Sequence, residues 1–172
     1  MTTHRFSVAE YYRLGELGLL DERTELIEGI VIDTEPIGPW HASVVDTLTQ
    51  AFVEQACGRF RVRVQQPINL GSESQPQPDL VLCRPGRYRD RHPASEDLFL
   101  VVEVADTTLD FDLADKRTLY AGAGIAEYWV IDVQAKKVTR FVHNGVEQPV
   151  SGTRISPVTF PDVGIDLAEL FG

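Results

Sequence analysis

The sequence predicts an α/β fold with a central mixed β-sheet flanked by helices. Segments with helical and with strand periodicity alternate along the chain, which is the pattern of helices packed on a sheet. The run Leu98–Val104 is apolar except for one carboxylate, and such runs are typical of strands covered on both faces. A chain of 172 residues is expected to form a single domain, residues 1–172, with its own core.

The first third of the chain contains two helix signals and one strand signal. Ser7–Glu10 has the form of a capping box, so a short helix is expected to run through Leu14. Residues 25–32 are predicted to form one strand, with a bulge or bend at the glycine in its middle. Apolar residues recur at spacings of three and four over residues 41–57, which predicts an amphipathic helix ended by Gly58.

The middle of the chain is predicted to supply three strands and the loops between them. Period-two alternation indicates a half-buried strand at residues 60–64. A polar loop with prolines, residues 71–78, leads to a short apolar strand at residues 79–83. A long charged loop, residues 84–97, then precedes the apolar strand at residues 98–104.

The last third is predicted to contain a helix, a hairpin and a short closing helix. Residues 110–123 have a helical pattern with glycines at its end. The strands at residues 127–133 and 138–142 are expected to pair as a hairpin, and Asn144-Gly145 to make a tight turn. A last short helix is expected around residues 166–170.

The charge balance counts against strong, nonspecific binding of nucleic acid. The formal net charge is −10 and the pI is about 4.8, whereas nucleic-acid binders usually present a basic surface. Seven arginines nevertheless fall between residues 59 and 91. A solvated strand face followed by a charged loop is the favoured interpretation, and a local basic patch is the alternative. These residues are Arg59, Arg61, Arg63, Arg84, Arg87, Arg89 and Arg91.

Cysteine usage and the N-terminus indicate a cytoplasmic protein. Cys57 and Cys83 lie far apart and form no C-x-x-C pair, so both are expected to be reduced. Residues 1–8 lack the apolar core of a signal peptide. No stretch approaches the roughly 18 to 20 apolar residues that cross a bilayer, so no membrane partner is expected.

Two carboxylates at the ends of predicted strands are the first candidate site residues. Glu103 interrupts an apolar strand, where a carboxylate is unfavourable unless it is paired or binds a cation. Asp79 follows Pro78 at the start of another strand, and alone it would be interpreted as a turn aspartate. Together they could converge on a hard divalent cation such as Mg²⁺, which prefers a few carboxylate oxygens and waters. Glu103 could instead reach water or an arginine at the strand end.

Lys116 is the third candidate because its helix directly follows the strand that carries Glu103. Asp112, Lys116 and Tyr120 are spaced i, i+4, i+8 and share one helix face. By spacing alone, an exposed Asp–Lys pair worth a few tenths of a kcal/mol is the simpler interpretation. The position one crossover after Glu103 is what makes the lysine a candidate.

Glu25 and His41 are further candidates. Glu25 lies at the start of a predicted strand and could join the acidic cluster, or it could be a surface residue. His41 lies at a predicted helix N-terminus, where the positive end of the dipole disfavours its protonation. It could act as a neutral acid or base or contact a phosphate, or it could belong only to the cap region. Glu127, Tyr128 and Trp129 are assigned to packing or to a dimer contact.

Several motifs resemble the Uma-two family, a bacterial group in the PD-(D/E)XK nuclease superfamily. They are Pro78-Asp79, Glu103-Val-Ala-Asp-Thr-Thr, Asp112-x-x-x-Lys116-x-x-x-Tyr120 and Ala123-Gly-Ile-Ala-Glu-Tyr-Trp-Val-Ile-Asp132. Glu25-Leu-Ile-Glu-Gly29 and His41 are similar to the N-terminal half of that family. The resemblance covers the chain from about Ser7 to Phe171.

The resemblance implies a restriction-endonuclease-like fold and a divalent-metal site that cleaves DNA. Asp79, Glu103 and the backbone carbonyl of Val104 would bind Mg²⁺, with Mn²⁺ as an alternative. Lys116 would orient the attacking water and stabilise charge on the phosphate. The superfamily places its lysine two residues after the glutamate, where this chain has Ala105. The resemblance implies that Lys116 replaces it from the helix.

The sequence is also compatible with other functions. The acidic pI also fits a non-enzymatic binding or assembly module that retains a nuclease fold. A hydrolase that uses two carboxylates on sugars is a weaker alternative, because it needs no lysine. A nuclease that cuts both strands of a duplex needs two active sites, so a homodimer is expected.

Overall fold

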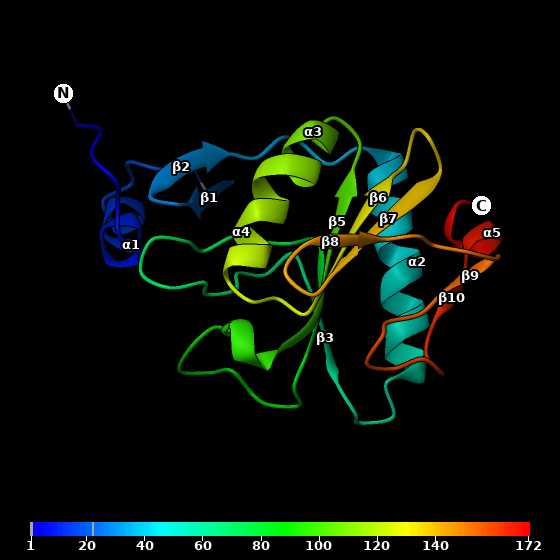
Figure 1. Cartoon of the computed structure of the whole chain (residues 1–172). Coiled ribbons are helices and arrows are strands. Elements are labelled where there is room, and N and C mark those ends of the chain that lie inside the picture. The colour runs from blue at the N-terminus through cyan, green and yellow to red at the C-terminus, as the bar shows by residue number, and fades with distance from the viewer. Residues whose placement is uncertain (1, 22) are drawn as a thin grey trace.

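A six-stranded mixed sheet forms the centre of the computed structural model, which describes residues 2–21 and 23–172 (Figure 1). The strand order is β3-β4-β5-β6-β7-β8, and only β5 and β6 run parallel. The strands are β3 (Arg61–Val64), β4 (Leu80–Cys83), β5 (Leu98–Ala105), β6 (Glu127–Asp132), β7 (Lys137–Val142) and β8 (Val146–Gln148). The predicted α/β class with a central mixed sheet is confirmed.

The segment predicted as one strand at residues 25–32 is a hairpin of two strands, so that prediction is wrong. β1 (Thr24–Ile27) pairs antiparallel with β2 (Ile30–Asp33). Between them, Glu28 and Gly29 have φ angles of 47° and 76°, and positive φ at both central residues matches the twist of a two-residue hairpin. Every residue of β1 is buried, which directs the Glu25 side chain into the protein.

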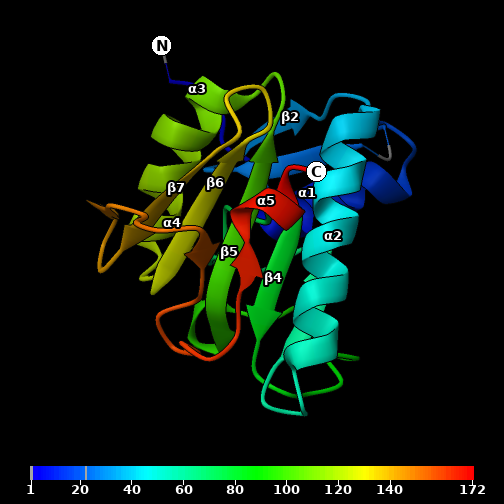
Figure 2. The same cartoon turned by 90° about the vertical axis from the view of Figure 1, so that its right-hand side faces the viewer.

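One face of the sheet is covered by α2 (Pro39–Gln55), which begins two residues before the predicted start (Figures 1 and 2). Pro39 occupies the first turn, where its missing N–H is no loss. The buried side of the helix presents Val44, Val45, Leu48 and Phe52 to the sheet. The last short helix, α5 (Leu167–Leu170), contacts α2, and the pair β9 (Arg154–Ile155) and β10 (Ile165–Asp166) lies beside it.

The opposite face is covered by the crossover that joins the parallel strands β5 and β6 (Figures 1 and 2). The crossover is not the single α-helix predicted for residues 110–123. It consists of α3 (Leu109–Phe111), a π-helical turn η2 (Asp112–Lys116) and α4 (Arg117–Gly122). A π turn inserts one residue into the helical repeat, and such turns are frequent at functional sites.

The N-terminal helix and the loops agree closely with the predictions. α1 (Val8–Glu16) begins with the predicted capping box, in which Ser7 and Glu10 satisfy each other's backbone N–H groups. The long loop after β4 is closed by a 3₁₀ turn η1 (Ser95–Asp97). No helix in the described parts of the chain is long and apolar enough to cross a membrane.

Two hydrophobic clusters lie on the two sides of the sheet, and β5 contributes to both. Trp129 is fully buried, and its indole N–H donates to Glu127 Oε1 at 2.7 Å. The backbone N–H of Val158 donates to the other oxygen of Glu127 at 2.7 Å. These contacts within the chain support packing as the role of residues 127–129. Both cysteines are free thiols.

Candidate active site

A cavity of about 670 Å³ lies at the end of the sheet where β5 leads into α3. Its wall contains the side chains of Glu25, His41, Asp79, Glu103 and Lys116, together with Val104. These residues come from β1, the start of α2, the residue before β4, the end of β5 and η2. The fold therefore brings all the predicted site residues into one cavity.

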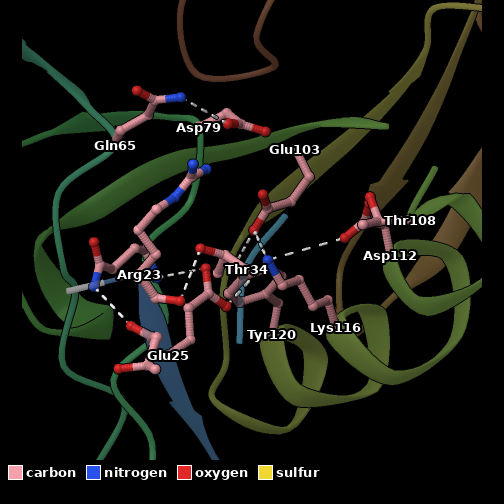
Figure 3. Close-up of polar contacts among 12 residues, drawn as sticks. Arg23, Glu25, Thr34, Gln65, Asp79, Glu103, Thr108, Asp112, Lys116 and Tyr120 are labelled. Carbon is pink, nitrogen blue, oxygen red and sulfur yellow. Dashed lines mark hydrogen bonds and ion pairs between the residues drawn. The ribbon is translucent and has the colours of Figure 1, made fainter. Parts of the chain in front are cut away.

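Lys116 lies at the centre of a buried cluster of carboxylates (Figure 3). Its Nζ atom is 3.0 Å from Glu103 Oε1, 3.3 Å from Glu25 Oε2 and 4.0 Å from Asp112 Oδ1. The lysine is 7% exposed, which overturns the simple interpretation of an exposed Asp–Lys pair. Ala105, at the position where the superfamily carries lysine, is buried, and Lys116 of η2 is the amine beside Glu103.

Glu103 is held through one of its two oxygens. The hydroxyl of Tyr120 donates to Oε1 at 2.6 Å, and the ammonium of Lys116 donates to the same atom at 3.0 Å. Within residues 2–21 and 23–172, no donor forms a hydrogen bond with the second oxygen, Oε2. This arrangement fixes the carboxylate and leaves Oε2 available to a ligand.

Asp79 is held through both of its oxygens at the mouth of β4. His41 Nε2 lies 2.8 Å from Oδ1, and the Gln65 amide donates to the same oxygen at 3.4 Å. The backbone N–H of Val104 donates to Oδ2 at 2.8 Å. These contacts orient Asp79 toward the end of β5, where Glu103 lies.

The pKa of His41 is shifted in the direction opposite to the one that its helix position predicts. It is the third residue of α2, so the helix dipole disfavours protonation. Burial lowers the pKa of His41, but the hydrogen bond and charge of Asp79, with help from Asp106 and Asp112, raise it above the usual value. The direct contact with the Asp79 carboxylate therefore outweighs the effect of the helix end on the pKa of His41.

Glu25 joins the cluster from the small hairpin. Its Oε1 accepts the backbone N–H of Gln77 at 3.2 Å, and its Oε2 faces Lys116. The carboxylate is 4% exposed, so the surface interpretation is wrong.

Asp112, Tyr120 and Thr108 complete the cluster, although the sequence did not single them out as site residues. Asp112 is 2% exposed, and the Thr108 hydroxyl donates to its Oδ2 at 2.6 Å. The i, i+4, i+8 spacing of Asp112, Lys116 and Tyr120 was the available signal. That spacing identifies a shared face but not whether the face is buried.

The cluster carries an excess of negative charge. Glu25, Asp79, Glu103 and Asp112 share one lysine and one histidine. Burial raises the pKa of Glu103 well above its usual range, Lys116 opposes this, and the neighbouring carboxylates add to it. Burial also raises the pKa of Asp112 to about 6. Burial lowers the pKa of Lys116, but Glu103, Glu25 and Asp112 outweigh it and keep the amine charged.

Acidic surplus of this kind suits a cation, because a positive charge would relieve the repulsion among buried carboxylates. No group of three or more His, Cys, Asp or Glu side chains in the described part of the chain is arranged to hold a metal ion. Mg²⁺ does not need such a group, since it is usually bound by one or two carboxylates and keeps several waters. The donor set is therefore compatible with Mg²⁺ but not with a closed cage of side chains.

The mixed sheet with helices on both faces agrees with the expected restriction-endonuclease-like fold. The sequence matches the model of the Uma2 family, described as putative restriction endonucleases, over residues 8–168, and the chain belongs to this family. The resemblance inferred from the motifs is thereby confirmed.

One solved structure supports the fold independently. It is described as a putative nuclease belonging to DUF820 from Anabaena variabilis ATCC 29413, and it superposes with a TM-score of 0.71. The match covers 92% of this chain and 96% of that chain at 16% sequence identity, a level that shows a shared fold. No curated protein matched the sequence.

Proposed function

We propose that this protein is a divalent-metal-dependent endonuclease that hydrolyses phosphodiester bonds in DNA. The observation that carries the proposal is the Lys116 ammonium among three buried carboxylates, in the cavity that also contains Asp79. Burying so many like charges is unfavourable, and such clusters occur mainly where a cation binds or a reaction takes place. The family description favours a nucleic acid as the substrate.

Asp79, Glu103 and the Val104 carbonyl are the proposed ligands of Mg²⁺, for which Mn²⁺ could substitute. Glu103 has its Oε2 atom available, and Asp79 is oriented beside it. The N–H of Val104 donates to Asp79, and the N–H and C=O of one strand residue face the same side. The Val104 carbonyl is therefore directed to the same region as Asp79. Oxygen donors of this type suit Mg²⁺ and Mn²⁺.

The chain's own residues would position and stabilise the reacting groups. A bound divalent ion lowers the pKa of a coordinated water and neutralises charge on the phosphate. Lys116, kept protonated by its carboxylates, would orient the attacking water and donate to the phosphate oxygen that gains charge. Tyr120 would hold Glu103, and His41 would hold Asp79, so that both carboxylates keep their orientation.

The test is nicking of supercoiled plasmid with Mg²⁺, with Mn²⁺ and with EDTA. We expect Mg²⁺-dependent nicking by the parent protein and a loss of at least about 100-fold in Lys116→Ala and Asp79→Ala, because each removes a group that acts on the transition state. Lys137→Ala, an exposed lysine on β7, is the matched control and should nick as the parent does. Equal residual nicking by the parent and by all three variants would indicate a contaminating nuclease and contradict the proposal.

A non-enzymatic binding module is the second candidate function. The net charge of −10 favours it, because strong binding of DNA normally requires a basic surface. It predicts no metal-dependent cleavage of any nucleic acid, whether or not Mn²⁺ binds in a calorimetric titration. The endonuclease proposal predicts Mn²⁺ binding and metal-dependent cleavage.

A homodimer is part of the proposal, since cutting both strands of a duplex requires two active sites. Sedimentation velocity should show a species of twice the chain mass of 19.2 kDa. A strict monomer at micromolar concentration, together with double-strand cleavage, would contradict this assembly.

A further inference from the structure

The arginines of residues 59–91 form a defined surface that the proposed active site does not use. This segment carries seven of the 16 basic residues of a chain whose formal net charge is −10. We call the group on β3 and in the loop that follows β4 the arginine surface. Its members are Arg61, Arg63, Arg87, Arg89 and Arg91. Arg84 is not a member, because its guanidinium lies over Phe99, which packs with the hydrophobic cluster on the α2 side of the sheet.

Packing holds Arg63 of β3 and Arg91 of the loop against the same tyrosine, Tyr88. Arg61 and Arg63 lie two residues apart on the edge strand β3, so they share one face of the sheet. The guanidinium carbons of Arg63 and Arg91 each lie 5.7 Å from the ring centre of Tyr88. The Tyr88 hydroxyl donates to the carbonyl of Arg84 at 2.8 Å, which holds the loop against the end of β4, the strand that pairs with β3.

Most of this positive charge has no internal partner. Arg91 is paired with Asp97 at 2.5 Å, but among the described residues no carboxylate lies within 4.0 Å of Arg61, Arg87 or Arg89. The Nε atom of Arg63 is buried without a hydrogen-bond partner in the same part of the chain. Burial lowers the pKa of the nearby His92, and the charge of Arg63 lowers it further, which indicates a positive potential at this surface.

The arginine surface is continuous with the cavity. β3 runs directly into Gln65, which lines the cavity and donates to Asp79. At about 3.3 Å per residue, Arg63 and Arg61 lie roughly 7 and 13 Å from Gln65 along the strand. The loop that carries the other arginines lies at the end of the sheet away from α3 (Figure 1). A duplex has a helical repeat of about 34 Å, so one molecule can span both regions.

We propose that the arginine surface binds the phosphodiester backbone of duplex DNA flanking the phosphate that lies in the cavity. The inference rests on the proposed function, because that function places the scissile phosphate beside Asp79. Guanidinium groups bind phosphate through parallel hydrogen bonds, and unpaired ones lose no internal ion pair when they do so. The surface explains how an acidic protein can hold a polyanion on one side.

The test measures binding without cleavage. Fluorescence anisotropy of a labelled 30-base-pair duplex in EDTA is recorded at several salt concentrations for the parent, Arg87→Gln/Arg89→Gln and Arg13→Gln/Arg154→Gln. The last variant loses the same charge from surface ion pairs elsewhere, Arg13–Glu16 and Arg154–Asp166. Thermal melting confirms that each variant is folded.

We expect Arg87→Gln/Arg89→Gln to bind about tenfold more weakly at low salt. The slope of log affinity against log salt should fall by about 1.8 in magnitude, since each lost phosphate contact contributes about 0.9. The control should keep the affinity and slope of the parent. Unchanged binding by the loop variant, an equal loss in the control, or no binding by the parent overturns the inference.

The outcome is separate from that of the nicking assay. Arginine-dependent binding without any Mg²⁺-dependent nicking would contradict the endonuclease and leave the arginine surface as the DNA site of a binding module. The converse result is Mg²⁺-dependent nicking that requires Lys116, together with duplex binding in EDTA that is unchanged in Arg87→Gln/Arg89→Gln. It would contradict the arginine surface and leave the endonuclease proposal standing.

Discussion

At the scale of single residues, the Tyr120 hydroxyl has a specific role in the site. It is 1% exposed and donates to the same oxygen of Glu103 as Lys116 does. Two donors on Oε1 hold the carboxylate plane, so that Oε2 keeps one orientation. Groups that orient metal ligands in this way typically change metal affinity or activity by 10- to 100-fold when removed.

Tyr120→Phe should therefore weaken Mn²⁺ binding and lower kcat by about tenfold. It should also reduce the free energy of unfolding by about 1–3 kcal/mol, because Glu103 loses a buried hydrogen bond. Calorimetric titration, nicking rates and urea unfolding measure these effects. Tyr128→Phe is the control, because its hydroxyl donates to a backbone carbonyl, that of Asp112. A stability loss in both variants with unchanged Mn²⁺ affinity in Tyr120→Phe would leave Tyr120 with only a structural role.

Asp112 predicts a pH dependence of stability. Burial raises its pKa from 3.8 to about 6, so the native state holds a proton that the unfolded state releases between these values. The contribution of Asp112 to the free energy of unfolding is therefore complete below about pH 4 and is lost as the pH rises to about 6. The two-unit difference corresponds to about 3 kcal/mol as an upper figure.

Asp112→Asn should remove this contribution. Urea unfolding at pH 4 and pH 6.5 should show that the variant gains stability relative to the parent as pH rises, by about 1–3 kcal/mol. The comparison is made as a difference from the parent, because Glu10 and Asp97 have lowered pKa values and act in the opposite direction. A constant difference between variant and parent across this range would contradict the assignment.

At the scale of elements, the π turn sets the relative orientation of the site residues on the crossover. η2 contains both Asp112 and Lys116, and both side chains are buried. A turn with one additional residue changes which side chains face the sheet on either side of it. The π turn and the helix that follows it carry Asp112, Lys116 and Tyr120, and all three side chains are buried.

Deleting Ala114, an exposed residue inside η2, should convert the turn to regular α-helix. Asp112 and Lys116 would then be separated by three positions of regular helix, about 300° of rotation, instead of four positions of the wider π turn, so their side chains would lose their present alignment. We expect nicking to fall to the level of Lys116→Ala while far-UV circular dichroism remains that of the parent. Ala114→Ser keeps the length and should nick normally. Full activity in the deletion variant would show that the π turn is dispensable.

Local sequence patterns predicted most elements, and they failed where backbone geometry or long-range packing decides. The hairpin of β1 and β2 was missed because Glu28 has positive φ although it is not glycine. Alternating apolar residues look the same on both sides of such a turn. The π turn was missed because the apolar repeat continues through it.

The candidate site was predictable only where a local pattern marks a residue, and not where long-range packing decides. Glu103 is conspicuous because it interrupts an apolar strand. The buried state of Lys116 is not encoded in its spacing from Asp112, because an exposed pair has the same spacing. The contact between His41 and Asp79 joins residues 38 positions apart and reversed the expected direction of the histidine pKa.

At the scale of the whole molecule, the proposed metal should couple to stability. The proposed ligands come from separate elements, the start of β4 and the end of β5, and the unfolded chain does not bring them together. A ligand present at 100 times its Kd stabilises the native state by about 2.7 kcal/mol.

Saturating Mg²⁺ should accordingly raise the melting temperature by several degrees, since about 1 kcal/mol shifts a domain of this size by 2–4 °C. Asp79→Asn should lose the shift, and Lys137→Ala should retain it. Differential scanning calorimetry with and without Mg²⁺ provides the measurement. An equal shift in all three proteins would indicate a general salt effect rather than binding at this cavity.

Lys116 gives the protein an internal counterion. Its ammonium holds Glu25, Glu103 and Asp112 together, as a bound ion would. Small metal-dependent domains unfold when a chelator removes their ion, because nothing else assembles the ligands. Here a tethered positive charge keeps the carboxylates assembled in advance. Exhaustive chelation should therefore abolish the proposed nicking activity while leaving the protein folded. Returning Mg²⁺ should then restore nicking without a refolding step.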